Sequence, residues 1–559
     1  MVSGLMAAPQ TPVQLLEEIA HLMQLAGENP FKTRAFEKAA GLLAEVSESD
    51  LKVRARAGTL TELEGIGKGI SEVLTEFLLH GTSKAREELV ASLPRGLLEL
   101  TQIPGLGPKK ATQLIEELGI ESIRELEYAC KENRLLKIKG FGEKLQHKIL
   151  ESIAFLHSSE GQARLDEILP AAQKLITELR EALGVRVEES GALRRRCEVL
   201  SEVELLIEAG ASVNEAGASV KKIEAILAKN PLKIEVKPSF ADPKQWGYEW
   251  AKSTASEEHW KGLKSPACPR GALASTEEAF YQEHGLPWIE PVMRETGSEL
   301  LRAKQKGEKG LGGVIQSIDL KGLFHCHTTR SDGAATLEEM VEAARTRGYH
   351  YLGISDHSQS AFYAQGLKSD TLQEQEREIR KLQEKIDQKH GGFKIFWGIE
   401  SDILKDGSLD YSDSVLKRFD FVIASIHQRF QADRETMTER IVQAIRNPYT
   451  RFIGHLTGRL LLGRKAYDID IERIIREAHE HDVAIELNAH PQRLDIDWRW
   501  GPELQKQGTL ISINPDAHEI SGLDDTQYGV WMAQKALMPK HQVINTRSSD
   551  EVARWLARK

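Results

Sequence analysis

From residue 320 onward, seven short apolar segments alternate with amphipathic helical patterns, and no other feature constrains the fold of this chain as strongly. The helical patterns, such as TLEEMVEAARTRG and IERIIREAHEHD, repeat apolar residues at three- and four-residue spacing. Strands that alternate with helices form parallel sheets, so we predict a barrel-like α/β domain over residues 318–559. We place its strands near residues 322–326, 350–355, 393–399, 420–426, 451–454, 483–487 and 510–514.

Histidines gather in this region, because 11 of the 18 in the chain fall between residues 320 and 518. Functional side chains of parallel α/β barrels lie at the C-terminal strand ends, and six histidines and three carboxylates take that position here. Imidazole and carboxylate groups are ligands of divalent transition metals, so the arrangement predicts a metal centre. The nine candidate ligands are His325, His327, Asp332, His357, Glu400, His427, His455, Asp516 and His518.

A lone His-x-His motif would be weak support for a metal, because surface and core histidines are commoner than ligands. The whole set at strand ends is hard to explain by chance. Cys326 lies between two candidate ligands on a strand and points to the other face, so we expect it to pack in the core. We expect six further histidines to be structural or solvated: His350, His390, His479, His481, His490 and His541.

Three segments of the first 150 residues place hydrophobic–x–Gly–hydrophobic–Gly between predicted helices. Two glycines allow a tight turn, and the helix that follows offers free backbone N–H groups to a phosphate. One copy would be explained equally well by the packing of two helices, but three copies favour nucleic-acid binding. The candidate DNA-binding residues are Gly65, Gly67, Lys68, Gly105, Gly107, Lys109, Lys110, Gly140, Gly142 and Lys144.

Composition limits how this chain can bind DNA. Its 74 basic and 84 acidic residues give a net charge of −10, which argues against a binder that relies on a basic surface. Residues 1–150 hold 19 basic and 21 acidic residues, so the geometry of the hairpins must supply most of the DNA binding.

No apolar run is long enough for a membrane span, and the N-terminus lacks a secretory pattern. The four cysteines lie far apart without a CxxC pair, which indicates a reducing cytoplasm.

The three glycine segments resemble helix-hairpin-helix DNA-binding motifs. Their order, together with NPFKTRAFEKAA at residues 29–40, resembles the N-terminal region of family X DNA polymerases. The resemblance implies helical DNA-binding regions over 1–95 and 96–155 that contact gapped, nicked or recessed DNA ends. Some members cleave abasic sites through a Schiff-base lysine. Here Val73 stands at that position and Lys68 is offset, so we do not predict lyase activity.

The resemblance continues in GALRRRCEVLSEVELLI at residues 191–207 and implies an α+β nucleotidyltransferase-like palm with a thumb-like region over 156–300. The family carries Gly-Ser-x-Arg-Arg and then Asp-x-Asp on a strand. Gly191 and Arg194 are kept, but Ala192 replaces the serine, and Glu202 and Glu204 replace the aspartates. Mg²⁺ demands near-ideal octahedral geometry, which the longer glutamates disturb, so we expect a degenerate polymerase site without Mg²⁺. The glycine-rich residues 301–317 predict a linker.

The histidine motifs resemble the PHP (polymerase and histidinol phosphatase) domain, which implies a distorted (β/α)7 barrel with two to three Zn, Mn or Fe ions. One ion would be held by His325, His327, Glu400 and Asp516. A second would share Glu400 with His427 and His455. A third would be held by Asp332, His357 and His518.

The same resemblance implies metal-assisted hydrolysis at phosphorus, with Glu400 bridging two ions and Asp516 accepting a proton from the attacking water. We expect Asp356 to orient a histidine, although it would serve equally as a helix cap. Arg459 and Arg493 are candidate phosphate clamps, unless they form ordinary surface ion pairs. Asn488 is a further substrate-contact candidate.

Over residues 10–559 the chain resembles a bacterial family X DNA polymerase with a C-terminal PHP domain. We predict a monomeric DNA-repair enzyme whose PHP domain is a 3′–5′ exonuclease, with cleavage at abasic sites and removal of 3′-phosphates as further reactions. One alternative is an active gap-filling polymerase that uses Glu202 and Glu204. Another is a small-molecule phosphatase of the histidinol-phosphate type, which would have no use for DNA-binding hairpins.

Overall fold

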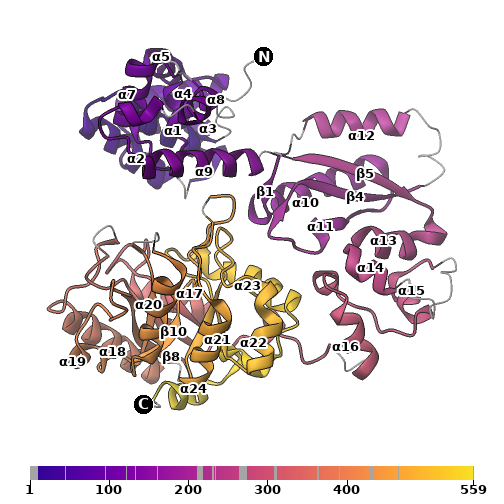
Figure 1. The fold of residues 1–559 in the computed structure, drawn as a ribbon. Helices are drawn as coiled ribbons and strands as arrows, with labels where there is room; N and C mark the ends of the chain where they lie inside the picture. The colour runs from indigo at the N-terminus through magenta and orange to yellow at the C-terminus, as the bar shows by residue number, and fades with distance from the viewer. Residues whose placement is uncertain are drawn as a thin grey trace. The chain divides into compact units, whose positions relative to one another are not determined.

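The computed structural model divides the chain into two compact units, residues 1–160 and 161–559 (Figure 1). Among the described residues, no helix is both long and apolar enough to cross a membrane. The structure describes residues 11–557 apart from 44–45, 95, 121, 132–133, 160, 210–217, 230–231, 233, 264–273, 307–310, 362–363, 390, 429–431 and 464. His390 and the predicted loop at residues 265–271 therefore lie outside the described residues.

The N-terminal unit is helical, as the sequence predicts. Its apolar side chains form two separate clusters, one drawn mainly from residues 15–78 and the other mainly from residues 97–153. Val73, which the resemblance matches to the lyase lysine, is buried in the first cluster. The helices are α1 (Pro12–Leu25), α2 (Pro30–Leu43), α3 (Glu48–Ala57), α4 (Lys68–His80), α5 (Lys84–Ser92), α6 (Leu97–Leu100), α7 (Pro108–Leu118), α8 (Ile123–Lys131) and α9 (Glu143–Ser159).

Residues 161–306 form an α+β region around a three-stranded sheet of order β2-β4-β5. Strand β4 (Glu202–Glu208) is antiparallel to β2 (Val187–Glu189) and parallel to β5 (Glu235–Ala241). Apolar residues of α10 (Leu165–Leu183) and α12 (Ala218–Lys229) share a hydrophobic cluster with the buried face of β4. The remaining elements are β1 (Ala163–Arg164), β3 (Val199–Leu200), α11 (Gly191–Arg194), α13 (Trp246–Thr254), α14 (Glu257–Leu263), α15 (Glu277–Glu283) and α16 (Ser298–Lys306).

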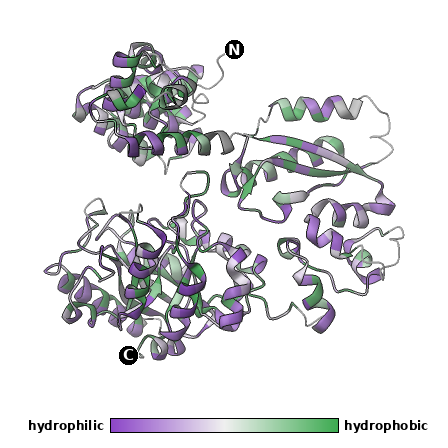
Figure 2. Cartoon of the chain, in the orientation of Figure 1, coloured by the Kyte–Doolittle hydropathy of each residue, from purple (hydrophilic) through white to green (hydrophobic). Residues whose placement is uncertain are grey.

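The C-terminal region is the predicted parallel barrel. Seven strands pair in sequence order, every neighbouring pair is parallel, and a bridge between Cys326 and Ala517 brings the first strand beside the last. The strands are buried along nearly all of their length, as expected for strands covered on both faces. Hydrophobic segments are drawn in green within this region in Figure 2. They are β6 (Gly322–Cys326), β7 (Tyr351–Ile354), β8 (Lys394–Asp402), β9 (Phe421–Ser425), β10 (Thr450–Ile453), β11 (Ala484–Asn488) and β12 (Ile511–Asn514).

Helices alternate with these strands along the chain. Where a full α-helix follows a strand, its apolar face packs toward the barrel, as in α21, whose Ile474, Ile475 and Ala478 are buried. The helices are α17 (Leu337–Thr346), α18 (Leu372–Lys389), α19 (Asp413–Leu416), α20 (Arg434–Arg446), α21 (Ile471–Glu480), α22 (Gly501–Gln507), α23 (Thr526–Lys535) and α24 (Ser549–Leu556).

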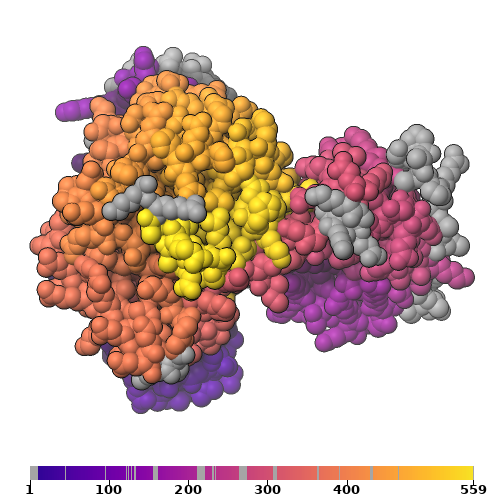
Figure 3. Space-filling view, turned by 90° about the horizontal axis from the view of Figure 1, so that it is seen from below, coloured from indigo at the N-terminus to yellow at the C-terminus, as the bar shows by residue number. Residues whose placement is uncertain are grey.

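Aromatic rings fill the barrel beneath the strand ends that carry the histidines. Phe324 contacts Phe421 and Phe452 at ring-centroid distances of 5.1 and 4.8 Å. Trp555 of α24 packs on Phe452 at 5.4 Å, so the last helix covers the opposite end of the barrel. The C-terminal segment forms part of the surface seen in Figure 3. The aromatic layer leaves only one end of the barrel open for chemistry.

The predicted linker over 301–317 differs from the structure. Helix α16 continues to Lys306, and Val314 and Ile315 are buried in the same hydrophobic cluster as the barrel. The Ile315 N–H donates to the Met538 carbonyl at 3.0 Å. Glycine and charged residues dominate the sequence of this stretch, so the sequence pattern did not indicate that Val314 and Ile315 pack against the barrel.

Candidate metal centre and DNA-binding elements

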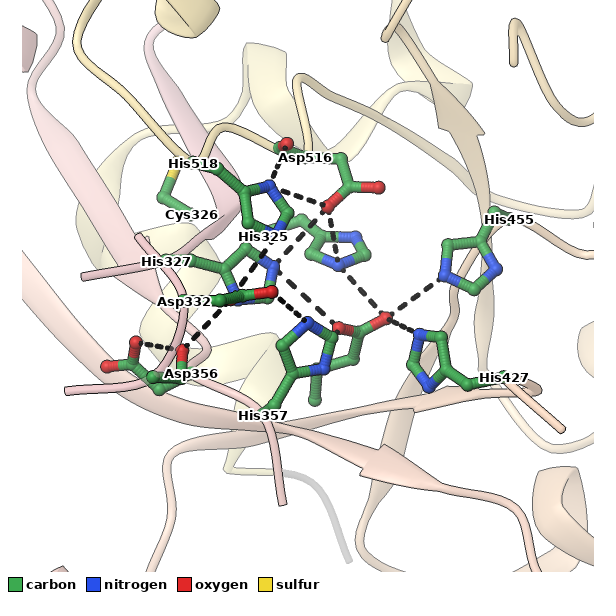
Figure 4. A network of polar contacts seen from close by, with 12 residues as sticks. His325, Cys326, His327, Asp332, Asp356, His357, His427, His455, Asp516 and His518 are labelled. Carbon is green, nitrogen blue, oxygen red and sulfur yellow. Dashed lines mark hydrogen bonds and ion pairs between the residues drawn. The ribbon is translucent and has the colours of Figure 1, made fainter. Parts of the chain in front are cut away.

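The nine predicted ligands converge at one end of the barrel, although they come from six different strand ends (Figure 4). His325 lies in β6 and His327 follows it, Glu400 lies in β8, and the other histidines and Asp516 come within four residues of a strand end. Most of their side chains are buried. Asp332 and His518 are 30% and 39% exposed and mark the side that faces solvent.

Glu400 is the centre of the cluster. Its Oε1 lies 3.1 Å from Nε2 of His325, 3.2 Å from Nε2 of His427 and 3.1 Å from Nε2 of His455. Its Oε2 lies 3.0 Å from Nδ1 of His357. A carboxylate that faces imidazoles through both oxygens is suited to bridge two cations.

Three groups of side chains lie close enough to hold a metal ion. The first joins His325, His327 and Asp516, whose Oδ1 lies 3.4 Å from Nε2 of both histidines. The second joins Glu400 and His427 with His357 rather than with His455. The third joins Asp332, His357 and His518 with His327 added. All three groups found among the described residues lie in the barrel.

Several buried nitrogens at this end have no hydrogen-bond partner among the described residues. They include Nε2 of His325, both ring nitrogens of His327 and Nδ1 of His455. Buried polar atoms are nearly always satisfied, so a group of unsatisfied imidazole nitrogens beside carboxylates indicates a missing ligand. Divalent cations fit this donor set because they bind neutral imidazole and carboxylate together.

The electrostatics of the cluster lead to the same conclusion. Burial would raise the pKa of Glu400 and Asp516, but neighbouring imidazoles, His325 foremost, hold both pKa values well below their ordinary range. Burial would lower the pKa of His427, yet Glu400 and Asp402 raise it to about 10. Burial, reinforced by His518 and His357, lowers the pKa of His327 to about 3. The carboxylates thus need positive charge beside them, which bound cations would supply.

Two carboxylates that orient candidate ligands, Glu486 and Asp402, were not predicted from the sequence. Glu486 of β11 lies 2.6 Å from Nδ1 of His325 and accepts a hydrogen bond from the His455 N–H at 2.7 Å. Asp402 of β8 lies 2.5 Å from Nδ1 of His427. Carboxylates behind metal-binding histidines fix the ring orientation and raise ligand basicity. Strand alternation pointed to them, because each lies two residues from a predicted site residue, Asn488 or Glu400.

The predicted roles of Asp356 and Asn488 change in the structure. Asp356 is buried and accepts hydrogen bonds from the Thr328 N–H, the Ser331 hydroxyl and the Gln375 amide at 2.6–2.7 Å. It therefore anchors the loop that leads to Asp332, instead of orienting a histidine as predicted. Asn488 is fully buried, and its amide donates to Glu486 at 3.1 Å and to Asp516 at 3.0 Å. The hydrogen bond to Asp516 positions that carboxylate. Because the Asn488 amide donates to both carboxylates, it has no N–H left for a substrate.

The two candidate phosphate clamps differ. Arg459 is occupied, because its guanidinium ion-pairs with Asp497 and donates to the carbonyl oxygens of Arg493 and Leu494. Arg493 lies at the site, with Nε 3.6 Å from Oδ2 of Asp516, and its buried Nη1 has no hydrogen-bond partner among the described residues. A phosphate oxygen would satisfy that donor, so Arg493 stays a candidate phosphate clamp, and Arg459 supports the loop that carries it.

The three glycine turns of the N-terminal unit share one backbone conformation. The first glycine of each pair has a positive φ, +78° at Gly65 and +93° at Gly105 and Gly140. The hydrophobic residue that follows is buried, and its N–H donates to the carbonyl three residues earlier at 3.0–3.1 Å. These residues are Ile66, Leu106 and Phe141.

The second glycine of each turn opens a helix. Gly67 caps α4 and Gly107 caps α7 without any side chain that accepts from the first helical N–H groups. A Cβ on Gly67, Gly107 or Gly142 would meet nothing within 4 Å, so internal packing does not require glycine there. The open approach and the free N–H groups suit a phosphate. Lys68, Lys109 and Lys144 are exposed and Lys110 is half-buried beside these helix starts.

The two glutamates of the palm-like sheet have partners within the protein. Glu202 forms an ion pair with Lys237 of β5, and the strand register places Lys237 beside Glu204. The Glu204 carboxylate lies over Gly191, where a Cβ would come within 1.4 Å of its Oε2. It also accepts a hydrogen bond from the Ala192 N–H. A glutamate thus folds back into the turn that resembles the nucleotide-binding turn of the family.

Arg194 of the same turn is committed to a buried ion pair. Its two terminal nitrogens lie 2.8 and 2.6 Å from the carboxylate of Glu277, and Arg294 contacts the same carboxylate at 2.6 Å. Its guanidinium also lies 3.5 Å from the ring centroid of Trp250. These contacts are internal, so Arg194 supports the fold of this region.

Comparisons with known proteins agree with these elements. The family model of the PHP domain matches residues 324–490. A helix-hairpin-helix domain matches residues 8–83, and a SAM-like helix-hairpin-helix tandem matches residues 97–154.

Relatives cover either nearly the whole chain or a smaller part of it. A probable phosphatase of Caldanaerobacter subterraneus subsp. tengcongensis is 29% identical over 42% of this chain and 90% of its own length. Another, from Caldicellulosiruptor saccharolyticus, is 36% identical over 29% of this chain and 64% of its own. The DNA polymerase/3′-5′ exonuclease PolX of Bacillus subtilis (strain 168) is 34% identical over 98% of this chain and 99% of its own length. The chain therefore belongs to the family X DNA polymerases that carry a PHP domain.

Proposed function

We propose that the PHP centre hydrolyses phosphodiester bonds at the 3′ ends of DNA, as a 3′–5′ exonuclease that uses two to three divalent ions. The convergence of nine imidazole and carboxylate side chains around Glu400, with buried nitrogens left unsatisfied, carries this proposal. The glycine turns of the N-terminal unit and the name of the Bacillus subtilis relative support DNA as the substrate. Imidazole and carboxylate ligands suit Zn²⁺, Mn²⁺ or Fe²⁺.

Bound divalent ions would polarise the phosphate and lower the pKa of an attacking water. The residues of the chain orient both reactants. Asp516 lies between two histidines and Arg493, where it is placed to accept the proton of that water. The unsatisfied Nη1 of Arg493 binds a phosphate oxygen. Asp402 and Glu486 hold His427 and His325 in the orientation that ligation needs.

We further infer that nucleotidyl transfer has been lost. Lys237 neutralises Glu202, and Glu204 occupies the Gly191 turn. Lysine and backbone donors thus satisfy the carboxylates that Mg²⁺ ions would bind in an active palm. The enzyme would act in DNA repair as a monomer. We place it in the cytoplasm, and the three described cysteines, which are free, suit a reducing compartment. Cleavage at abasic sites and removal of 3′-phosphates are further reactions of the same centre.

The test uses a recessed, end-labelled DNA duplex with Mn²⁺, with and without dNTPs. We expect wild-type protein to shorten the 3′ end, Glu204→Ala to match it, and His327→Ala to lose activity. His350→Ala, an exposed histidine of the same domain, is the matched control and should match wild type. Extension that disappears in Glu204→Ala would restore the polymerase alternative. Inactivity on DNA with rapid hydrolysis of histidinol phosphate would favour the small-molecule phosphatase.

A further inference from the structure

The palm-like region reaches the loop of the barrel that carries Arg493. Glu198, just before β3, has a side chain that is only 9% exposed. Its Oε1 accepts a hydrogen bond from Nη1 of Arg499 at 2.6 Å, and its Oε2 accepts one from Nε1 of Trp498 at 3.4 Å. Both partners belong to the segment between β11 and α22, within the same compact unit.

From Arg499 a chain of charged contacts continues to the metal centre. Arg499 also contacts Asp497 at 3.0 Å, and Asp497 forms an ion pair with Arg459. The Arg459 Nε donates to the Arg493 carbonyl at 2.9 Å. Arg493 in turn faces Asp516. Two carboxylates and two guanidinium groups therefore alternate between the palm-like region and the residue that faces the phosphate.

The inner side of this loop is held by the barrel itself. Buried Asp495 accepts hydrogen bonds from the Thr457 N–H and hydroxyl, both at 2.9 Å, and pairs with Asn488 through the backbone. The outer side, residues 497–499, contacts both regions: Trp498 is buried in the hydrophobic cluster that includes the barrel, and Trp498 and Arg499 also donate to Glu198 of the palm-like region. Loss of Glu198 would remove one of the two carboxylates that Arg499 contacts among the described residues, and the other, Asp497, is shared with Arg459. The outer side of the loop would then lose its hydrogen bonds to the palm-like region and be held less firmly.

The chain segment just before Glu198 is held by a second contact with the barrel, which runs from Arg195 through Glu295 to Lys535. Lys535 of α23 is fully buried and forms an ion pair with Glu295, which also binds Nε of Arg195 at 3.2 Å. Nη1 of Arg195 donates to the Thr254 carbonyl at 2.7 Å. The turn that resembles a nucleotide-binding turn is thereby fastened to the barrel three residues before Glu198.

We propose that Glu198 is a positioning residue of the PHP site, through which the palm-like region holds residues 493–499 so that Arg493 meets the scissile phosphate of a DNA 3′ end. This inference rests on the proposed exonuclease function. It gives the palm-like region a part in hydrolysis that does not require nucleotidyl transfer. Neither Glu198 nor Arg499 touches substrate, so their effect passes through Arg493.

The first test measures the loop without any reaction. Amide hydrogen exchange over residues 490–500 is compared in the full-length wild type, Glu198→Ala, Glu198→Gln and Arg302→Ala. Arg302 is the matched control, because it joins the same two regions through a different contact, a hydrogen bond to the Leu537 carbonyl at 2.7 Å. We expect faster exchange in Glu198→Ala, a smaller change in Glu198→Gln, which keeps the hydrogen-bond acceptor, and none in Arg302→Ala. Unchanged exchange in Glu198→Ala overturns the proposal.

The second test is a double-mutant cycle on the labelled 3′ end with Mn²⁺. Arg493→Ala should raise KM about 10-fold, as expected for one charge-assisted hydrogen bond to phosphate. Glu198→Ala should raise KM several-fold with kcat and bound metal little changed, and should add nothing in the Arg493→Ala background. Effects that multiply would show that Glu198 acts independently of Arg493 and overturn the proposal. If wild type fails to shorten DNA, the exonuclease function fails, while the exchange experiment still decides the role of Glu198.

Discussion

At the scale of the residue, Glu486 shows how a buried carboxylate shapes a metal centre without being one of its predicted ligands. It contacts His325, accepts from the His455 N–H and receives the side-chain amides of Asn488 and Asn514 at 3.1 and 2.9 Å. Every lone-pair direction of this carboxylate is used. Its replacement disturbs the orientation of two imidazoles at once.

We expect Glu486→Gln to weaken metal binding about 10- to 100-fold while the protein stays folded, because the amide turns one acceptor into a donor. Metal content after dialysis against a graded chelator series measures the change. Glu435→Gln, at a side chain 78% exposed on the same domain, serves as the control. Equal metal retention in both variants would show that Glu486 does not orient the ligands.

Buried Glu277 gives the molecule a predictable response to acid. Burial would raise its pKa, but hydrogen bonds and charge from Arg194 and Arg294 lower the pKa to about 2 from an ordinary 4.5. A carboxyl whose folded pKa is depressed stabilises the protein above its unfolded pKa. This contribution is lost as the pH falls from about 4.5 toward 2.

Glu277→Gln should therefore lower the free energy of unfolding by about 3 kcal/mol at pH 7, and the difference from wild type should shrink below about pH 4. Urea denaturation across this pH range measures both quantities. Glu278→Gln, at an exposed neighbour, should show neither effect. If the difference in unfolding free energy between Glu277→Gln and wild type stayed constant across this pH range, the pKa of Glu277 would not be depressed in the folded protein.

At the scale of the element, the helix-hairpin-helix turns separate two roles of glycine. Gly105 has φ +93°, where an L-residue is strained, whereas Gly107 has φ −68° and open space around its Cα. The first glycine is required by the fold. The second keeps the start of α7 accessible.

Gly105→Ala should lower the free energy of unfolding by about 1–2 kcal/mol. Gly107→Val should change it by less than about 1 kcal/mol, yet weaken DNA binding about 10-fold by blocking the phosphate at the helix start. Denaturant titration and fluorescence anisotropy with labelled duplex in EDTA measure the two effects. Wild-type DNA affinity in Gly107→Val would show that this hairpin does not bind the backbone.

At the scale of the whole molecule, the chain consists of two compact units with separate cores. The predicted metal ligands lie in residues 161–559, and the glycine turns lie in residues 1–160. Hydrolysis and non-specific DNA binding should therefore be separable by truncation.

A chain of residues 161–559 should hydrolyse p-nitrophenyl phosphate like the full protein, but its KM for a DNA 3′ end should rise about 10-fold or more, because tethered DNA contacts are lost. Steady-state kinetics on both substrates measure the separation, and His327→Ala in the same truncation should be inactive on both. A KM for DNA that is unchanged by truncation would show that the N-terminal unit does not contribute to this reaction.

Local patterns in the sequence determined the barrel, its open end and the convergence of the nine predicted ligands, because strand periodicity and the βα rule place C-terminal strand ends together. They also determined the glycine turns, whose left-handed φ at Gly65, Gly105 and Gly140 is a local requirement. Only the tertiary structure decided which carboxylate orients which histidine. It also decided that Asp497 forms an ion pair with Arg459, and that Glu198 accepts a hydrogen bond from Arg499, 301 positions away in the sequence. Such contacts depend on distances between elements far apart in the chain. No local periodicity carries that information.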